Sequence, residues 1–382
     1  MVYSEDYKKL VDATALKDKY YEIDERVEEI CKEAFKGCDK LEEIVMPKKL
    51  KKIDSEAFQG CSSLTKLTLP SRVASIGRWA FYGCSGLTEL TLPDTLECIE
   101  AFAFGGCSGL TELTLPNRVR IIEVSAFECC SGLTELTLPN SVKSIGDGAF
   151  AYCSGLEKIT VESGNSRYNS RDNCNSIIDK KTNTLIAGCK NSVIPNSVAR
   201  IDGLAFCGCS GLTELTLPNS VKSIGDGAFA YCSGLTELTL PNSVKSIGRY
   251  AFQGCSGLTE LTLPNSVKSI GDRAFAYCSG LTELTLPNSV TSIGNCAFGG
   301  CSGLTELTLP NSITSIGDYA FAYCSDLSKI TSLAEIPPMC GFKVFNGVNK
   351  TNCELIVPEG SVAAYTRAED WNKFSNIRGF SK

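Results

Sequence analysis

The stretch CSGLTELTLPNSVKSIGDGAFAY, residues Cys209–Tyr231, is followed at Cys232 by a second copy of almost the same phrase. The phrase ends on a cysteine every 23 residues, in one series up to Cys153 and in a second from Cys209, and twelve units are visible. An internal period of this length is typical of stacked units that each contact only their neighbours. The repeat therefore overrides the two or three compact domains that a chain of 382 residues would otherwise suggest.

The copies share the pattern L-x-x-L-x-L-P-x-x-V-x-x-I-x-x-x-A-F-x-x-C. In one copy Leu215 and Leu217 alternate with Glu214 and Thr216, which is the two-residue period of a β-strand. Pro218 ends this strand, because proline has no N–H for the ladder. We therefore expect one short strand in each coil and a parallel sheet where the coils stack.

This pattern resembles the BspA-like class of leucine-rich repeats over nearly the whole chain. The resemblance implies a right-handed, curved leucine-rich repeat solenoid, with a parallel β-sheet on one face and short strands, turns and 3-10 segments on the other. It also implies a non-enzymatic protein-binding surface that works in adhesion or host interaction, and a place at the cell surface or outside the cell. The segments Ile159–Gly188 and Ile336–Ile377 are similar to the hairpin insertion and the terminal cap of such proteins.

We divide the chain into five segments by the repeat and its interruptions. They are an N-terminal helical cap at 1–26, a first repeat array at 27–156, a hairpin-like insertion at 157–197, a second repeat array at 198–330 and a C-terminal cap at 331–382. The cap helix is predicted over residues 6–17, where Tyr7, Leu10, Val11 and Leu16 have mostly helical spacing.

A hairpin is predicted inside the insertion. The segments Ser176–Asp179 and Thr184–Ile186 flank the polar residues 180–183, as two strands flank a turn. A loop on a repeat scaffold often carries binding. The insertion is therefore either a binding element or a structural splint between the two arrays.

Composition excludes several classes of function. Histidine is absent, which removes the usual general base and the commonest metal ligand, so we expect no cofactor and no metal site. Paired carboxylates are abundant but occupy the positions of a repeat surface, so we expect no enzyme, and an enzyme that uses carboxylates is the least favoured of three function classes. With 37 basic and 43 acidic side chains the net charge is -6, and this is not the charge of a nucleic-acid-binding protein. No apolar run reaches the length of about 18 residues that a membrane span requires.

The sequence holds 21 cysteines, twelve of them in the repeat column. Neighbouring column positions should lie about 4.8 Å apart, which exceeds the Cβ–Cβ distance of about 3.8 Å in disulfides. We expect free thiols that act as small hydrophobic side chains. The pairs Cys129-Cys130 and Cys207-x-Cys209 are weak metal signals, because one member of each belongs to the column.

The many thiols favour a reducing setting. The N-terminus has no apolar run of about 7 to 15 residues, so we expect no signal peptide there. These two observations support an alternative to adhesion, an intracellular scaffold or effector that binds a protein partner in the cytoplasm. In either case we expect a monomer whose partner is a protein.

Candidate binding residues lie at outward positions of the coils. The first group differs between coils and comprises aromatic and basic residues of the types enriched at interaction hot spots, namely Arg78, Trp79, Tyr82, Arg249, Tyr250 and Tyr319. The alternative for these rings is to seal the edge of neighbouring coils. The second group is a column of glutamates on the sheet face, which includes Glu214, Glu237, Glu260, Glu283 and Glu306. This column either contacts a basic surface or keeps the sheet soluble.

Overall fold

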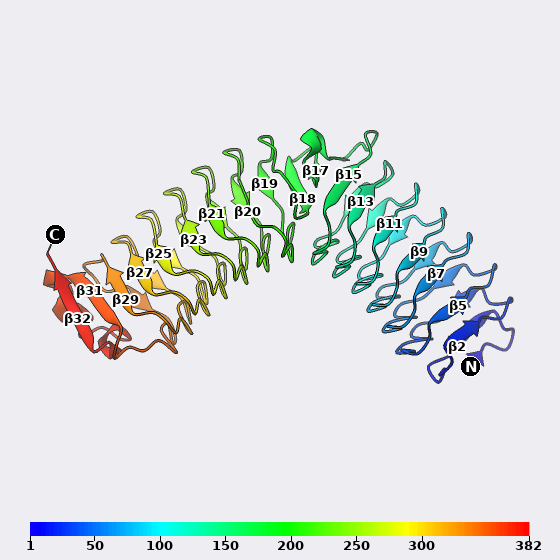
Figure 1. Ribbon diagram of the computed structural model, residues 1–382, viewed down its shortest axis with the longest axis horizontal. Coiled ribbons are helices and arrows are strands. Elements are labelled where there is room, and N and C mark those ends of the chain that lie inside the picture. Colours follow the sequence, from blue (N-terminus) through cyan, green and yellow to red (C-terminus); the bar gives the residue numbers. More distant parts are fainter. Residues whose placement is uncertain (382) are drawn as a thin grey trace. The chain divides into compact units, whose positions relative to one another are not determined.

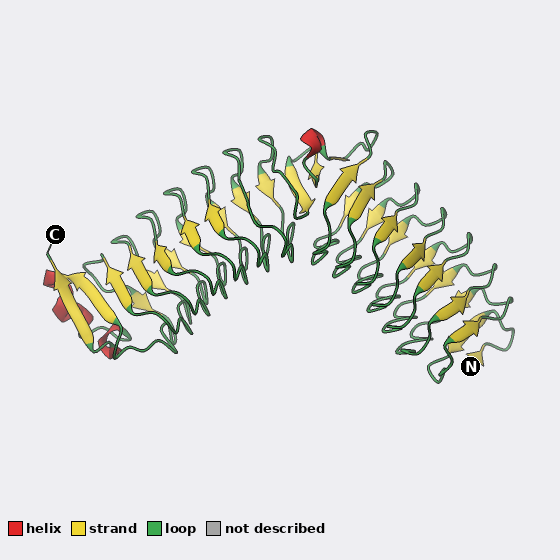
Figure 2. Ribbon diagram, in the orientation of Figure 1, coloured by secondary structure: helices red, strands yellow, loops and turns green. Residues whose placement is uncertain are grey.

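The computed structural model describes residues 1–381, which form two compact units, Met1–Val193 and a second unit that begins at Ile194. Each unit is a stack of coils, and the strands of successive coils lie side by side (Figure 1). Strands and turns make up nearly all of both units (Figure 2), with one short α-helix, α1 (Val362–Tyr365), in the described part of the chain. The predicted leucine-rich repeat solenoid is confirmed.

The leucine segments of the coils form the first ladder of parallel strands, as predicted. In the first unit these strands are β3 (Tyr20–Glu22), β5 (Glu43–Val45), β7 (Lys66–Thr68), β9 (Glu89–Thr91), β11 (Glu112–Thr114), β13 (Glu135–Leu138) and β15 (Lys158–Val161). In the second unit they are β21 (Glu237–Thr239), β23 (Glu260–Thr262), β25 (Glu283–Thr285), β27 (Glu306–Leu309), β29 (Lys329–Ser332), β31 (Glu354–Pro358) and β32 (Asn376–Phe380). Identical residues are in register, as in the pair Leu238 and Leu261.

The segment that ends in the isoleucine of the repeat pattern forms a second parallel ladder of mostly two-residue strands. In the first unit its strands are β2 (Lys9–Asp12), β4 (Glu29–Ile30), β6 (Lys52–Ile53), β8 (Ser75–Ile76), β10 (Cys98–Ile99), β12 (Ile121–Ile122) and β14 (Ser144–Ile145). In the second unit they are β19 (Arg200–Ile201), β20 (Ser223–Ile224), β22 (Ser246–Ile247), β24 (Ser269–Ile270), β26 (Ser292–Ile293), β28 (Ser315–Ile316) and β30 (Met339–Cys340). The short strands expected on this face are present, and they hydrogen-bond from coil to coil.

The inward side chains of the coils stack as columns. The phenylalanine column is continuous within each unit, with parallel rings 5.1 Å apart between Phe58 and Phe81 and 5.3 Å apart between Phe252 and Phe275. These four side chains are fully buried. Burial of each such ring contributes about 2–3 kcal/mol, and a single coil could not supply the partner surface by itself.

The segment of each coil that contains the Ala-Phe pair of the repeat pattern forms turns and not a 3-10 helix. Two residues in each of these turns have positive φ, for example Trp79 with φ 54° and Gly83 with φ 74°. A 3-10 helix needs consecutive right-handed residues, so positive φ at these two positions limits the segment to isolated turns. The 3-10 segments of the structure lie elsewhere, at η1 (Arg171–Asn173), η2 (Glu359–Ser361) and η3 (Trp371–Lys373).

The helix predicted over residues 6–17 is wrong. This segment contains β2, which is antiparallel to β1 (Val2–Tyr3) and parallel to β4, so that Leu10 lies in register with Ile30. The backbone N–H of Ala13 donates to the carbonyl of Ala34 in the next coil, at 2.6 Å. Residues 1–26 therefore form a degenerate coil of the same solenoid. The apolar residues of this segment are three apart, a spacing that fits the inward positions of a coil and a helix face equally well. Tyr7 has a φ of 56°, which a helix cannot contain.

The hairpin in the insertion is confirmed. Strands β17 (Ser176–Asp179) and β18 (Thr184–Gly188) pair antiparallel, and β16 (Tyr168–Asn169) joins the outer side of β17. The buried Asn165 amide donates to the carbonyls of Pro139 and Val142, at 2.8 and 3.1 Å. These bonds fix the start of the insertion to the coil before it.

Trp371, Phe374, Ile377 and Phe380 stand three apart in the sequence, which is near the spacing of a helix face, but they do not share a helix. Ile377 and Phe380 lie on β32, which pairs in parallel with β31, while Trp371 lies in η3. The buried Trp371 ring contacts Phe345 at a centroid distance of 5.2 Å. Aromatic side chains from a non-repeating segment thus continue the phenylalanine column.

Candidate binding surfaces

The turn edge is our name for the surface formed by the eight residues that end at each column cysteine, such as 77–84. It is held by backbone bonds between coils, since the N–H groups of Trp79 and Phe81 donate to Ala101 and Ala103 at 3.1 and 2.8 Å. The fifth residue before the column cysteine has positive φ, at Glu33, Glu56, Trp79, Phe102, Ser125, Gly148, Leu204, Gly227, Tyr250, Arg273, Cys296 and Tyr319. This conformation costs a non-glycine residue about 1–2 kcal/mol, so bulky residues here are not selected for backbone stability.

In the first unit the structure brings Arg78, Trp79 and Tyr82 into one cluster. Trp79 stacks on Phe102 of the next coil with centroids 5.4 Å apart, and Tyr82 contacts the same Phe102 ring edge-on at 6.4 Å. The Arg78 guanidinium lies 5.5 Å from the centroid of the Trp79 ring. Arg78 and Tyr82 are exposed, while Trp79 and Phe102 are half-buried. The cluster therefore presents an aromatic surface that is both rigid and accessible.

In the second unit Arg249 and Tyr250 form a second cluster. The guanidinium groups of Arg249 and Arg273 each lie 5.6 Å from the centroid of the half-buried Tyr250 ring. Cation–π contacts of this kind order the arginines at an exposed site. Because Arg273 comes from the next coil, the cluster exists only when the coils stack.

Tyr319 belongs to a third cluster, near the end of the repeats. Its ring is half-buried and meets Phe342 edge-on at 5.5 Å, and Phe342 is 59% exposed. The Lys343 ammonium lies 4.9 Å from the Phe342 centroid. An aromatic ring covered partly by a cation thus recurs at all three clusters.

Sequence reasoning missed Phe102, Arg273 and Phe342, which complete these clusters. Phe102 and Arg273 stand 23 residues after Trp79 and Tyr250. A residue one period later is the spatial neighbour in the next coil, so the repeat itself held the signal for these two. Phe342 was harder to find, because the coil that contains it departs from the repeat pattern.

The glutamate column follows the exposed face of the first ladder. Glu237 is in register with Glu260, Glu283 is in register with Glu306, and all four are exposed. Lys329 ends the column and its ammonium lies 3.0 Å from a carboxylate oxygen of Glu306.

Glu214 departs from the column prediction in one respect. It is exposed beside the half-buried Leu215, as the alternation requires, but the structure assigns no strand to residues 211–219. The segment keeps the alternation of buried and exposed side chains without the ladder hydrogen bonds that define a strand. The strand predicted at Leu215–Leu217 is therefore wrong for this coil and correct for the coils that follow it.

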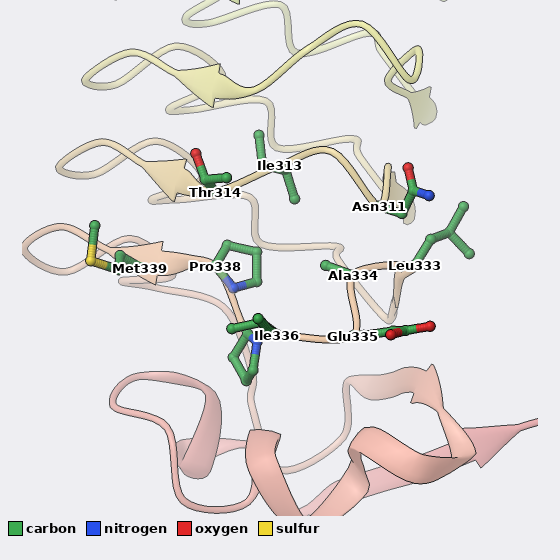
Figure 3. A pocket seen from close by; sticks show the side chains of 10 residues that line it. Asn311, Ile313, Thr314, Leu333, Ala334, Glu335, Ile336, Pro338 and Met339 are labelled. Carbon is green, nitrogen blue, oxygen red and sulfur yellow. The ribbon is translucent and has the colours of Figure 1, made fainter.

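An apolar groove of about 510 Å³ lies between the last regular coil and the coil after it. Figure 3 shows Ile313 and Thr314 on one coil and the run from Ala334 to Met339 on the next. Ile336 and Met339 are 82% and 74% exposed. Sequence reasoning missed this groove, although the Ile336-Pro337-Pro338 insertion into the repeat was a signal of an irregular coil.

The described residues contain no arrangement that suggests catalysis. Within residues 1–381 no group of three or more Asp, Glu, Cys or His side chains could hold a metal ion. Burial raises the pKa of the Cys98 thiol to about 11 and that of Cys130 well above its ordinary value. A thiol with a raised pKa is a poor nucleophile at neutral pH.

The fold and these surfaces define the class of the protein, a leucine-rich repeat solenoid. A family model described as the BspA type leucine-rich repeat region, in six copies, matches residues 15–97, 75–182, 176–302 and 268–352. The chain belongs to the BspA-type leucine-rich repeat family.

Several solved structures are similar to this chain. A leucine-rich cell surface protein from Faecalibacterium prausnitzii is 27% identical with a TM-score of 0.56, over 85% of this chain and 83% of that one. A leucine-rich repeat protein from Eubacterium ventriosum is 24% identical with a TM-score of 0.62, over 76% and 84%. The pneumococcal vaccine antigen PcpA is 23% identical with a TM-score of 0.55, over 95% and 79%. The last two likenesses concern the fold alone. No curated protein matches the chain.

Within residues 1–381, none of the helices combines the length and apolar character needed to cross a bilayer.

Proposed function

We propose that this protein is a non-enzymatic binding protein of the cell surface, which contacts a protein partner in adhesion or host interaction. The observation that carries the proposal is the cluster of Arg78, Trp79, Tyr82 and Phe102 on the turn edge. Trp79 occupies a left-handed backbone position at which glycine would be more stable. Every regular coil has this backbone conformation, so what distinguishes this coil is the aromatic cluster that it holds there at the surface.

The type of side chain supports the same conclusion. Tryptophan, tyrosine and arginine dominate binding hot spots because they bury a large, rigid surface around a polar group. The cluster around Tyr250 offers the same chemistry in the second unit, and Tyr319 offers it a third time. Several moderate contacts on one chain add through effective concentration.

The glutamates on the sheet face are a weaker candidate. Glu214, Glu237, Glu260, Glu283 and Glu306 form a uniform surface, which can attract a basic partner but cannot discriminate between partners. We propose that they increase the rate of association with a basic partner and keep the sheet soluble, while the turn edge gives specificity.

The cell-surface location is tested by labelling intact source cells with a membrane-impermeant lysine reagent, with a cytosolic protein as the leakage control. Labelled chain supports the proposal, as does the description of the similar Faecalibacterium prausnitzii protein as a cell surface protein. Unlabelled chain from intact cells, with normal labelling in lysates, contradicts it and favours the intracellular scaffold.

The binding surface is tested with immobilised extracellular-matrix proteins and two variants of one coil. Trp79→Ala should weaken binding at least tenfold, as expected for a hot-spot residue. Arg72→Ala removes an exposed arginine of the same coil outside the cluster and should bind like the parent protein. Equal binding by both variants, each with unchanged circular dichroism, would contradict the role of the turn edge.

A further inference from the structure

A row of tyrosines runs along the turn edge of the second unit. The residue immediately before the column cysteine alternates from coil to coil between glycine and tyrosine, in the order Gly208, Tyr231, Gly254, Tyr277, Gly300, Tyr323. The three tyrosine side chains are 43%, 59% and 61% exposed. We call Tyr231, Tyr277 and Tyr323 the tyrosine row.

The alternation has a steric cause. A Cβ atom on Gly254 would lie 2.6 Å from Cδ1 of Tyr231, and a Cβ on Gly300 would lie 2.6 Å from Cδ1 of Tyr277. Each ring thus lies against the glycine of the next coil. A side chain in place of that glycine would displace the tyrosine ring. Tyrosines immediately before the column cysteine can therefore stand no closer than in every second coil.

The rings are also held in a rigid frame. Tyr231, Tyr277 and Tyr323 have φ of 60°, 61° and 61°, and their N–H groups donate to the next coil. The Tyr231 hydroxyl accepts a hydrogen bond from the Gln253 amide at 3.3 Å. A left-handed tyrosine is less stable than a left-handed glycine. These exposed rings are retained despite the unfavourable left-handed backbone, and hydrogen bonds between coils hold that backbone in place. They are therefore preorganised for a ligand.

The spacing of the row indicates the ligand. Phenylalanine rings of the same coils are stacked 5.2 to 5.5 Å apart, so with the same rise per coil we expect tyrosines two coils apart to be separated by about 10.5 to 11 Å. A single ligand that contacts all three rings would be a polymer that repeats the same apolar face at this interval. An extended β-1,4-linked polysaccharide repeats every two sugars at nearly this length, and its pyranose rings present C–H groups to one side.

We propose that the tyrosine row binds a linear β-1,4-linked polysaccharide, with one tyrosine ring under every second sugar. Tyrosine suits this ligand, because its ring face packs against C–H groups while its hydroxyl stays in contact with polar groups. Asp226, Arg249 and Arg273 are exposed charged residues of the same turn edge and are of mixed sign, which favours an uncharged polymer. This activity goes beyond the proposed protein binding and does not depend on it.

A polypeptide fits the row less well. A polyproline II helix, the form most often recognised by aromatic surfaces, repeats every three residues, or about 9 Å. Over the two intervals from Tyr231 to Tyr323, at the ring spacing of these coils, it would fall roughly 3 Å short of the tyrosine rings. A β-1,4-glycan stays in phase over the same distance.

The test uses the full chain with defined probes. Sedimentation with microcrystalline cellulose and chitin, and calorimetry with cellohexaose and chitohexaose, should detect binding to at least one of the two polymers and to its hexasaccharide. The α-1,4-linked maltohexaose and a polyproline peptide should not bind. Tyr277→Ala should weaken hexasaccharide binding about five- to tenfold. Tyr20→Ala removes a tyrosine that is 50% exposed outside the row and should leave binding unchanged.

A second variant tests the spacing itself. Inserting a second copy of residues 279–301 after Cys301 adds one coil without a tyrosine, which is a small change for a repeat protein. Tyr323 then lies three coils from Tyr277, and binding should fall to that of Tyr323→Ala. Binding of the parent chain to polyproline in place of the β-1,4 glycans, binding to none of the probes, or undiminished glycan binding by the inserted variant would each overturn the proposal.

Discussion

The thiol of Cys255 donates a hydrogen bond to the carbonyl oxygen of Phe229 in the preceding coil, with an Sγ–O distance of 3.3 Å. The same bond recurs along the column, for example from Cys61 to Phe35 at 3.1 Å and from Cys324 to Phe298 at 3.3 Å. Cys255 and Phe229 are fully buried. The column cysteine is therefore a polar link between coils as well as the small apolar side chain that the sequence indicates.

Replacing Cys255 separates these two roles. Cys255→Ala removes both the donor and the buried volume and should lower the free energy of unfolding by about 1–2 kcal/mol. Cys255→Ser keeps a donor of similar size and should lose less. Urea unfolding under reducing conditions measures both. An alanine variant as stable as the serine variant would show that the thiol acts only as a small hydrophobic group.

Stability should fall at alkaline pH because of the same column. Burial raises the pKa of Cys84, Cys255 and Cys324 to about 12, from an ordinary value near 9. Above pH 9 the unfolded chain loses these protons while the folded chain keeps them, so the unfolded state binds fewer protons and the free energy of unfolding decreases as pH rises. Below pH 8 the thiols contribute no pH dependence.

The measurement is the urea midpoint at pH 7 to 10.5 in the presence of reductant. A variant with serine at Cys84, Cys255 and Cys324 is the matched control, because it keeps the Lys and Tyr residues that also titrate in this range. Its midpoint should fall less steeply than that of the parent. Parallel slopes for the two proteins would contradict the role of the buried thiols.

The inward columns could be predicted from sequence, because identical residues 23 apart must occupy identical environments in a solenoid. The repeat pattern alone therefore predicts that Leu238, Phe252 and Cys255 face inward, and all three are buried. Leu10 could not be placed this way. Its spacing to Ala13 and Leu16 fits both a helix and a coil, and only pairing of Leu10 with Ile30 decides between them.

The candidate surfaces were predictable to a lesser extent. Trp79 and Tyr250 can be picked out in the sequence because they differ from the residues at the same position of other coils. Their left-handed backbone could not be predicted, because among the twelve regular coils glycine occupies that position only at Gly148 and Gly227. The contact between each row tyrosine and a glycine of the next coil could be predicted from sequence only if the direction of the tyrosine side chain were already known. Such features depend on side-chain direction, which periodicity does not specify.

At Tyr250 we expect glycine to be more stable than alanine, which is the reverse of their usual order. The φ of Tyr250 is 59°, so Tyr250→Gly should be more stable than Tyr250→Ala by about 1 kcal/mol, whereas glycine is the less stable residue in regular structure. Both variants lose the ring between Arg249 and Arg273 and should lose partner binding equally. Thermal unfolding compares the pair. An alanine variant equal to or more stable than the glycine variant would show that the left-handed position is not strained.

The contact between Tyr231 and Gly254 predicts a coupled effect of two substitutions. Gly254→Ala combines a left-handed backbone, φ 71°, with a Cβ only 2.6 Å from the Tyr231 ring, and should destabilise by more than the roughly 1–2 kcal/mol of the backbone alone. Gly37→Ala is the matched control, because φ is 72° there and nothing lies within 4 Å of the added atom.

In the double variant Tyr231→Ala/Gly254→Ala the ring is gone, so the cost of the second substitution should return to that of Gly37→Ala. Chemical unfolding of the parent, both single variants and the double variant gives the coupling free energy, which the contact predicts to be at least about 0.5 kcal/mol. Additive costs would mean that the ring does not lie on the glycine. In that case the alternation of tyrosine and glycine along the turn edge would have no steric basis.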